Sequence, residues 1–202
     1  MKIMTSFSRM SFMIGVVISA FTLKDKRFMN VEKYCIDFIK KGNDVNFAKS
    51  FLGGIYFDFK KYESSIDVYM DMMRDAVLSE NDISRLVEAL YRTGCYEKLI
   101  EVLVPLIEKY NVFDLYWYLG RSYYLLERND EAERIYKDLL SRKPDKKIRN
   151  DLALIYMKKG LSIIKLNVEQ AGELLSMAYE LDPEEQLVMD SLNVLERIKS
   201  EK

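Results

Sequence analysis

The chain of 202 residues contains no histidine. This absence removes the commonest general base and the commonest metal ligand, and it excludes Ser–His and Cys–His nucleophile pairs. The sequence also lacks a glycine-rich phosphate loop, and no acidic group has the spacing of a metal site. We therefore expect a protein that is not an enzyme, with no catalytic residues, no metal site and no cofactor.

Turn-forming residues and cysteines are also scarce. The 8 Gly and 3 Pro are too few for the many turns of an all-β fold, whereas abundant Leu, Ile, Met, Glu and Lys suit long helices. The only two cysteines, Cys35 and Cys95, are far apart and follow no paired spacing. They are interpreted as ordinary thiols, which mildly favours a reducing compartment.

Neither sign of charge is in clear excess, because 31 basic residues face 32 acidic ones. Proteins that bind nucleic acid usually carry an excess of Lys and Arg, since phosphate contacts dominate their affinity. The densest basic run, SRKPDKKIR at 141–149, is typical of a solvated turn between helices. The charge balance therefore predicts no nucleic-acid partner.

What the sequence does contain is a regular spacing of small and aromatic residues. The clearest copy surrounds Gly120 and consists of Tyr116, Leu119, Gly120, Tyr123, Ala132, Tyr136 and Pro144. The position of Gly120 recurs at Gly53, Val87 and Ala153, in steps of 34, 33 and 33 residues. Small residues at such positions allow two helices to cross closely, and a period of this length indicates an array of repeats.

This pattern resembles the tetratricopeptide repeat, a helix–turn–helix unit with an aromatic, a Leu-Gly pair, a Tyr, an Ala and a closing Pro at these spacings. The resemblance implies an all-α fold, a right-handed α-solenoid of stacked antiparallel helix pairs. It predicts four repeats over residues 46–183. Residues 184–202 then form a C-terminal capping helix that covers the last apolar surface.

Two departures from the repeat pattern lead to further expectations. Pro105 falls inside the second helix of the second repeat, where it lacks an N–H donor, and we expect a kink or a break there. In the fourth repeat, six extra residues at 161–166 separate the two helices, and we expect them to lengthen the first helix by nearly two turns.

Residues 1–45 form a hydrophobic N-terminal segment followed by a helix over 28–41, and two interpretations stay open. Residues 10–23 are apolar on all sides and follow Lys2 and Arg9, with Ser19-Ala20 as a cleavage site, which is typical of a signal peptide. Alternatively, the segment is a divergent first repeat, because Ser19 lies 34 residues before Gly53. The second interpretation is slightly favoured.

The resemblance also implies a binding surface, because the first helix of each repeat in this family lines a concave groove. The corresponding groove positions here are Phe47, Phe57, Asp58, Glu88, Tyr91, Arg92, Asp114, Trp117, Arg121, Tyr124, Leu125, Lys147, Asp151, Met157 and Lys158. Tyr, Trp and Arg dominate binding hot spots. An aromatic groove with Arg92, Arg121 and Lys158 suits an extended or helical peptide with apolar anchors and some acidic character. Trp117 either serves as an anchor or packs against the neighbouring repeat.

These features predict a non-enzymatic adaptor or scaffold that binds a segment of a partner protein in its concave groove. The compartment slightly favoured is the cytoplasm. The alternative is an exported or membrane-anchored assembly factor of a cell-envelope complex, with membrane contact only if residues 1–23 act as a signal or anchor. No feature of the sequence indicates an oligomeric state.

Overall fold

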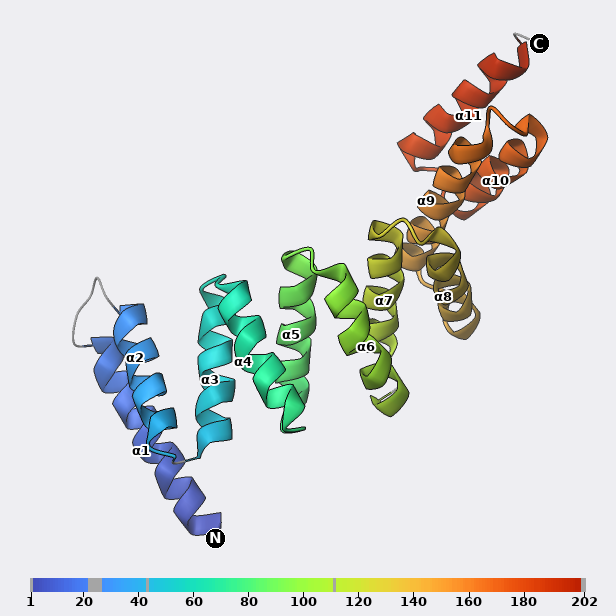
Figure 1. The fold of residues 1–202 in the computed structure, drawn as a ribbon. Helices are drawn as coiled ribbons and strands as arrows, with labels where there is room; N and C mark the ends of the chain where they lie inside the picture. The colour runs from blue at the N-terminus through green and yellow to red at the C-terminus, as the bar shows by residue number, and fades with distance from the viewer. Residues whose placement is uncertain (1, 22–26, 43, 111, 201–202) are drawn as a thin grey trace. The chain divides into compact units, whose positions relative to one another are not determined.

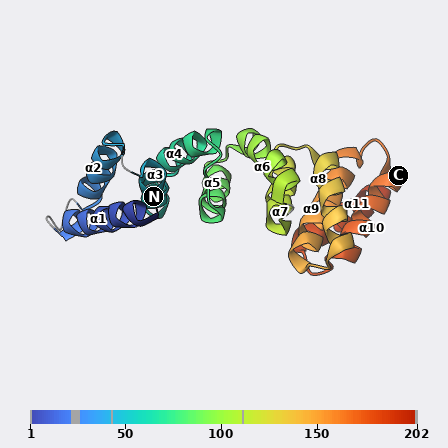
Figure 2. The same ribbon diagram turned by 90° about the horizontal axis from the view of Figure 1, so that it is seen from below.

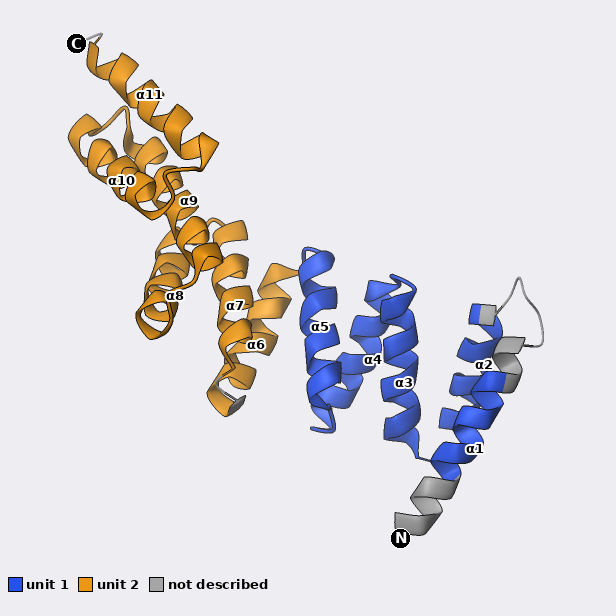
Figure 3. Ribbon diagram, turned by 180° about the vertical axis from the view of Figure 1, so that it is seen from behind, with its two compact units in different colours: residues 1–94 blue, residues 95–202 orange. Residues whose placement is uncertain are grey.

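A computed structural model describes residues 2–21, 27–42, 44–110 and 112–200 of the chain. Throughout these residues the secondary structure is helical, with eleven α-helices and no strand (Figure 1). The chain divides into two compact units, residues 1–94 and residues 95–202 (Figure 3). The boundary falls between the two helices of the second predicted repeat. The prediction of an all-α fold built from helix pairs is confirmed.

The first unit contains five helices that pack in chain order. They are α1 (Lys2–Phe21), α2 (Arg27–Lys40), α3 (Val45–Asp58), α4 (Tyr62–Arg74) and α5 (Glu80–Arg92). Each helix contacts the next, and α3 also contacts α5. The first helices of two successive repeats are therefore neighbours, as stacked helix pairs require.

Helix α1 is apolar on two faces, and the structure gives each face a different environment. Phe12 is fully buried and Val16 nearly so, in a cluster with residues of α2 and α3. The Phe12 ring meets four aromatic rings at centroid distances of 4.8–5.8 Å, those of Tyr34, Phe38, Phe47 and Phe51. The outward face exposes Met10, Met13, Ile14 and Val17. Among the described residues, no helix is both long enough and apolar enough to cross a membrane.

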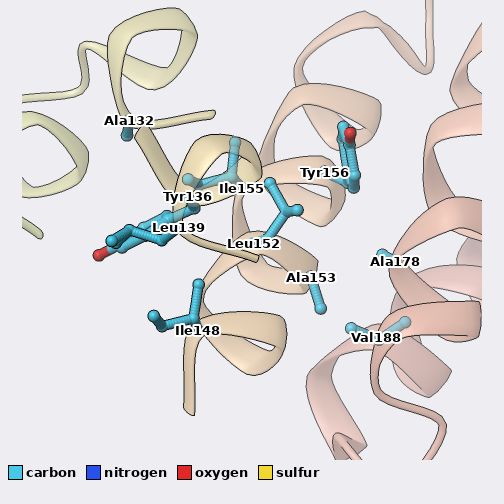
Figure 4. Packing of buried hydrophobic residues seen from close by; sticks show 10 residues of the cluster. All are labelled: Ala132, Tyr136, Leu139, Ile148, Leu152, Ala153, Ile155, Tyr156, Ala178 and Val188. Carbon is cyan, nitrogen blue, oxygen red and sulfur yellow. The ribbon is translucent and has the colours of Figure 1, made fainter. Parts of the chain in front are cut away.

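The second unit contains six helices, again packed in chain order (Figures 1 and 2). They are α6 (Tyr96–Tyr110), α7 (Phe113–Leu125), α8 (Asn129–Arg142), α9 (Lys146–Ile163), α10 (Val168–Leu181) and α11 (Gln186–Ser200). A buried cluster of this unit joins α8 to α9, with Tyr136 and Leu139 facing Ile148, Leu152 and Ile155 (Figure 4). Burial of apolar side chains such as these is the dominant favourable contribution to folding.

Close helix crossings occur where the repeat pattern places glycine. A Cβ atom built on Gly53 would lie 2.7 Å from a carbon of the Tyr69 ring, and one built on Gly120 would lie 2.7 Å from the same carbon of Tyr136. Both tyrosines are fully buried. The same glycine–tyrosine contact therefore joins α3 to α4 and α7 to α8, and any side chain larger than hydrogen would separate the helices.

A kink or a break was expected at Pro105, and the structure shows that the helix does not break there. Helix α6 continues from Tyr96 to Tyr110 with Pro105 inside it. Pro105 is exposed to solvent, so water can satisfy the carbonyl that loses its N–H partner. Buried residues lie on both sides of it, Val102 and Leu103 before and Leu106 and Ile107 after. Packing of these residues keeps the segment in one helix.

Helices α9 and α11 occupy the last third of the chain. Helix α9 has 18 residues where α7 has 13, so the additional residues lengthen it by five, or about 1.4 turns. Helix α11 buries Val188, Ser191 and Leu195 on one side. It contacts both α9 and α10 and exposes its other face to solvent.

Candidate functional site

Three of the predicted groove residues meet where α7 lies beside α9. The indole Nε1–H of Trp117 donates a hydrogen bond to Oδ2 of Asp151 over 2.8 Å, and Nη1 of Arg121 lies 3.0 Å from Oδ1 of the same carboxylate. Asp151 is only 9% exposed, so its charge is balanced inside the protein rather than by solvent. Trp117 thus contacts the next repeat, and its orientation is fixed by that contact.

A cavity of about 310 Å³ lies against this cluster. Its lining comes from the start of α7 and the start of α9 and consists of Phe113, Asp114, Trp117, Tyr118, Asp145, Lys147 and Ile148. We call it the α7–α9 cavity. Three predicted residues, Asp114, Trp117 and Lys147, line it directly.

Local helix signals position the polar residues of the α7–α9 cavity. Asp145 is the N-cap of α9, and its Oδ1 accepts a hydrogen bond from the Ile148 backbone N–H over 3.1 Å. Asp114 lies in the first turn of α7, where the helix dipole stabilises a negatively charged carboxylate. The Nζ of Lys147 lies 3.4 Å from the centroid of the Trp117 ring, close enough for a cation–π interaction.

The other predicted residues of this unit lie further along the same two helices. The Tyr124 ring has Cζ of Arg121 5.1 Å and Nζ of Lys158 5.2 Å from its centroid. Lys158 also forms an ion pair of 3.1 Å with Glu127. Met157 is half-buried and packs against the apolar core, so it contributes to packing.

The predicted residues of the first unit form a smaller arrangement on α3, α4 and α5. Glu88 and Arg92 are joined by an ion pair of 2.6 Å within α5. The Arg92 guanidinium lies 5.8 Å from the Tyr62 ring, which in turn meets the Phe57 ring at 5.6 Å. Tyr91, another predicted residue of this unit, is half-buried on α5.

A second cavity, of about 290 Å³, lies between α3 and α5 in the first unit. Its lining consists of Phe47, Ser50, Phe51, Gly54, Ile55, Asp58 and Arg85, of which Phe47 and Asp58 were predicted groove positions. The Arg85 guanidinium lies beside Gly54, where a Cβ would approach its Nη1 to 2.7 Å. In the sequence, the adjacent glycines Gly53 and Gly54 were the signal that could have indicated this cavity. The absence of a side chain leaves room for the Tyr69 ring at Gly53 and for the Arg85 guanidinium at Gly54.

The ion pairs change the expected charge preference of the groove. Each of the three cations that suggested an acidic partner has a carboxylate neighbour of its own: Arg92 has Glu88, Arg121 has Asp151, and Lys158 has Glu127. By contrast, within the part of the chain that the structure describes, Asp114 and Asp145 form no ion pair. The carboxylates of the α7–α9 cavity therefore have no ion-pair partner among the described residues, and neither does Lys147 of the same lining.

Comparison with known proteins identifies the fold. No family model matches the sequence, and no curated protein matches it. Among solved structures, a crystal structure of MamA is 19% identical, covers 91% of this chain and 94% of that chain, and superposes with a TM-score of 0.63. A MamA chain from Desulfovibrio magneticus RS-1 is 14% identical and covers 87% and 97% of the two chains, with a TM-score of 0.60.

A further similar structure is that of YrrB, described as "a TPR protein with an unusual peptide-binding site". It is 15% identical, covers 84% of this chain and 86% of that chain, and gives a TM-score of 0.61. At these identities the likeness concerns the fold. The chain therefore has the fold of tetratricopeptide-repeat proteins, an α-solenoid of helix pairs, as its repeat pattern indicated.

Proposed function

We propose that the chain is a non-enzymatic adaptor that holds a segment of a partner protein against α7 and α9. The observation that carries this proposal is the Trp117–Asp151–Arg121 cluster beside the α7–α9 cavity. It presents a large aromatic surface and a guanidinium whose positions are set before any partner arrives. A surface fixed in advance loses less conformational entropy on binding, which leaves more of the contact energy as affinity.

The cavity is suited to one anchoring side chain rather than to a small-molecule substrate. Its lining combines three aromatic side chains and Ile148 with three charged residues, Asp114, Asp145 and Lys147. In interfaces, such pockets accept a single side chain whose burial provides much of the binding energy. The half-buried Trp117 can then cover the anchor. The peptide-binding site of YrrB, a protein of similar fold, is in keeping with this use of the helix pairs.

The partner-binding surface can be tested with a pair of matched double variants. Trp117→Ala with Arg121→Ala removes both anchors, whereas Tyr179→Ala with Arg197→Ala removes an exposed aromatic and an exposed arginine from α10 and α11. The partner is first captured from the native cell with the intact protein and identified. Its affinity for the anchor variant should then fall by about 1–4 kcal/mol, with little change in the control variant.

Two results would decide against this surface. One is equal loss of affinity in both variants, and the other is unchanged affinity in the anchor variant. Far-UV circular dichroism of both variants separates loss of binding from loss of folding. Trp117→Phe, which keeps an aromatic ring but removes the donor to Asp151, should have an intermediate affinity.

An exported or membrane-attached form of the same adaptor is the second candidate. It is favoured by the exposed apolar face of α1, formed by Met10, Met13, Ile14 and Val17. Against removal of this segment stands Phe12, which packs into the core of the first unit and would be lost on cleavage. Fractionation of native cells and sequencing of the mature N-terminus distinguish the two forms, because a start near Phe21 requires export and cleavage.

A further inference from the structure

We propose that the α7–α9 cavity recognises an arginine side chain of the partner, and that Lys147 occupies the position of its guanidinium in the unbound protein. This inference rests on the proposed adaptor function and names the chemistry of the anchor. It reverses the acidic preference expected from Arg92, Arg121 and Lys158, whose charges are already compensated within the chain.

The rings of Phe113 and Trp117, which form the aromatic wall of the cavity, already lie beside cations of the chain itself. The Lys147 Nζ lies 3.4 Å from the Trp117 ring centroid, and the Lys143 Nζ lies 5.9 Å from that of Phe113. Both distances fall within the roughly 6 Å range in which a cation is attracted to an aromatic face. The wall is therefore suited to positive charge. Since Lys147 is exposed on the first turn of α9, its flexible side chain can move aside.

Two carboxylates at the cavity provide the complementary charge. Asp114 comes from the first turn of α7 and Asp145 from the N-cap of α9, and neither forms an ion pair among the residues that the structure describes. Oδ1 of Asp145 caps the helix, and Oδ2 has no such role. A guanidinium on the aromatic wall can donate hydrogen bonds to carboxylates beside that wall.

Arginine fits this combination better than lysine or an apolar residue. Its planar guanidinium stacks on aromatic rings, is more weakly hydrated than an ammonium group, and donates in a fixed fork that matches a carboxylate. Lysine offers only a compact charge, which Lys147 already supplies. An apolar anchor would leave both carboxylates without a partner, and an acidic anchor would be repelled by them.

The experiment uses three capped tripeptides that differ only in the central residue: Ala-Arg-Ala, Ala-citrulline-Ala and Ala-Glu-Ala. Citrulline has nearly the same shape as arginine but carries no charge. Trp117 is the only tryptophan of the chain, so the full-length protein gives a single indole N–H signal in the NMR spectrum, and that signal reports on the site. The arginine peptide should bind about three- to tenfold more tightly than the citrulline peptide.

Variants of the intact chain then assign the preference to named residues. Asp145→Asn removes the charge and keeps a good N-cap, and Asp114→Asn removes the other charge. With both changes, the ratio of arginine to citrulline affinity should approach one. Lys147→Met, which keeps the length of the side chain and removes the competing ammonium, should tighten binding of the arginine peptide about two- to fivefold.

Three results would overturn the inference: equal affinity for arginine and citrulline, tighter binding of the glutamate peptide, or weaker arginine binding in Lys147→Met. The proposed function has its own readout, the capture of the identified partner by the Trp117/Arg121 variant. If that capture depends on Trp117 while the arginine preference is absent, the adaptor function stands and only the arginine anchor is rejected.

Discussion

Gly120→Ala should destabilise the second unit, although alanine forms helices better than glycine. A Cβ at this position would lie 2.7 Å from Cε1 and 3.0 Å from Cζ of the Tyr136 ring. Tyr136 is fully buried, so its ring has no free space into which to move. Overpacking of this kind costs about 1–3 kcal/mol, whereas the change from Gly to Ala inside a helix contributes about 1 kcal/mol in the opposite direction. The free energy of unfolding should fall by up to about 2 kcal/mol.

Gly172→Ala provides the matched control in the same unit. Gly172 also lies inside a helix, α10, but a Cβ there would be 3.4 Å from Cδ2 of Leu195 and 3.6 Å from Nζ of Lys199, which is ordinary contact. The variant should gain about 0.5–1 kcal/mol from helix propensity. Because both variants share that gain, the difference between them isolates the clash with Tyr136, about 1–3 kcal/mol.

Urea unfolding followed by far-UV circular dichroism measures both variants against the wild-type chain. Gly53→Ala repeats the test in the first unit, where the Cβ would lie 2.7 Å from Cε1 of Tyr69. If Gly120→Ala proves as stable as Gly172→Ala, the close crossing of α7 and α8 does not depend on the missing side chain. The reasoning that links the repeat spacing to glycine would then be refuted.

Three further predictions follow from side-chain environments. Burial raises the pKa of the Cys35 thiol to about 12, so at pH 8 only the exposed Cys95 should react with a thiol reagent, with the second thiol titrating after denaturation. Asp151→Ala should increase quenching of Trp117 fluorescence by acrylamide and lower the free energy of unfolding by about 1–3 kcal/mol, because it leaves partly buried donors without their acceptor. Burial would raise the pKa of Glu133, but hydrogen bonds from two lysines outweigh it and lower the pKa below the ordinary 4.5. A carboxylate with a depressed pKa stabilises the fold above its unfolded pKa, so the stability advantage of wild type over Glu133→Gln should disappear as the pH falls below 4.5.

The helix pairs could be predicted from sequence because their determinants are local and periodic. The interval from Gly53 to Tyr69 equals the interval from Gly120 to Tyr136, and the structure shows the same glycine–tyrosine contact in both places. Pro105 shows where local reasoning fails. Its cost to a helix is fixed by backbone chemistry, but whether that cost breaks the helix depends on tertiary packing of the residues around it.

The candidate site was harder to predict, because its geometry depends on distances between helices. The resemblance to the tetratricopeptide repeat implied that Trp117, Arg121 and Asp151 share one face, yet it could not show that Asp151 would accept hydrogen bonds from the other two. Nor could it show that Lys147 would lie on the indole ring. A repeat pattern states which side of a helix faces a neighbour, and the pairing of individual charges requires coordinates.

The packing of Phe12 gives proteolysis near the N-terminus a specific consequence. A cut close to residue 20 would remove Phe12 and uncover the four rings that surround it, those of Tyr34, Phe38, Phe47 and Phe51. Newly exposed apolar surface of this kind promotes aggregation or recruits a chaperone. The full-length and shortened chains would therefore differ in solubility as well as in length.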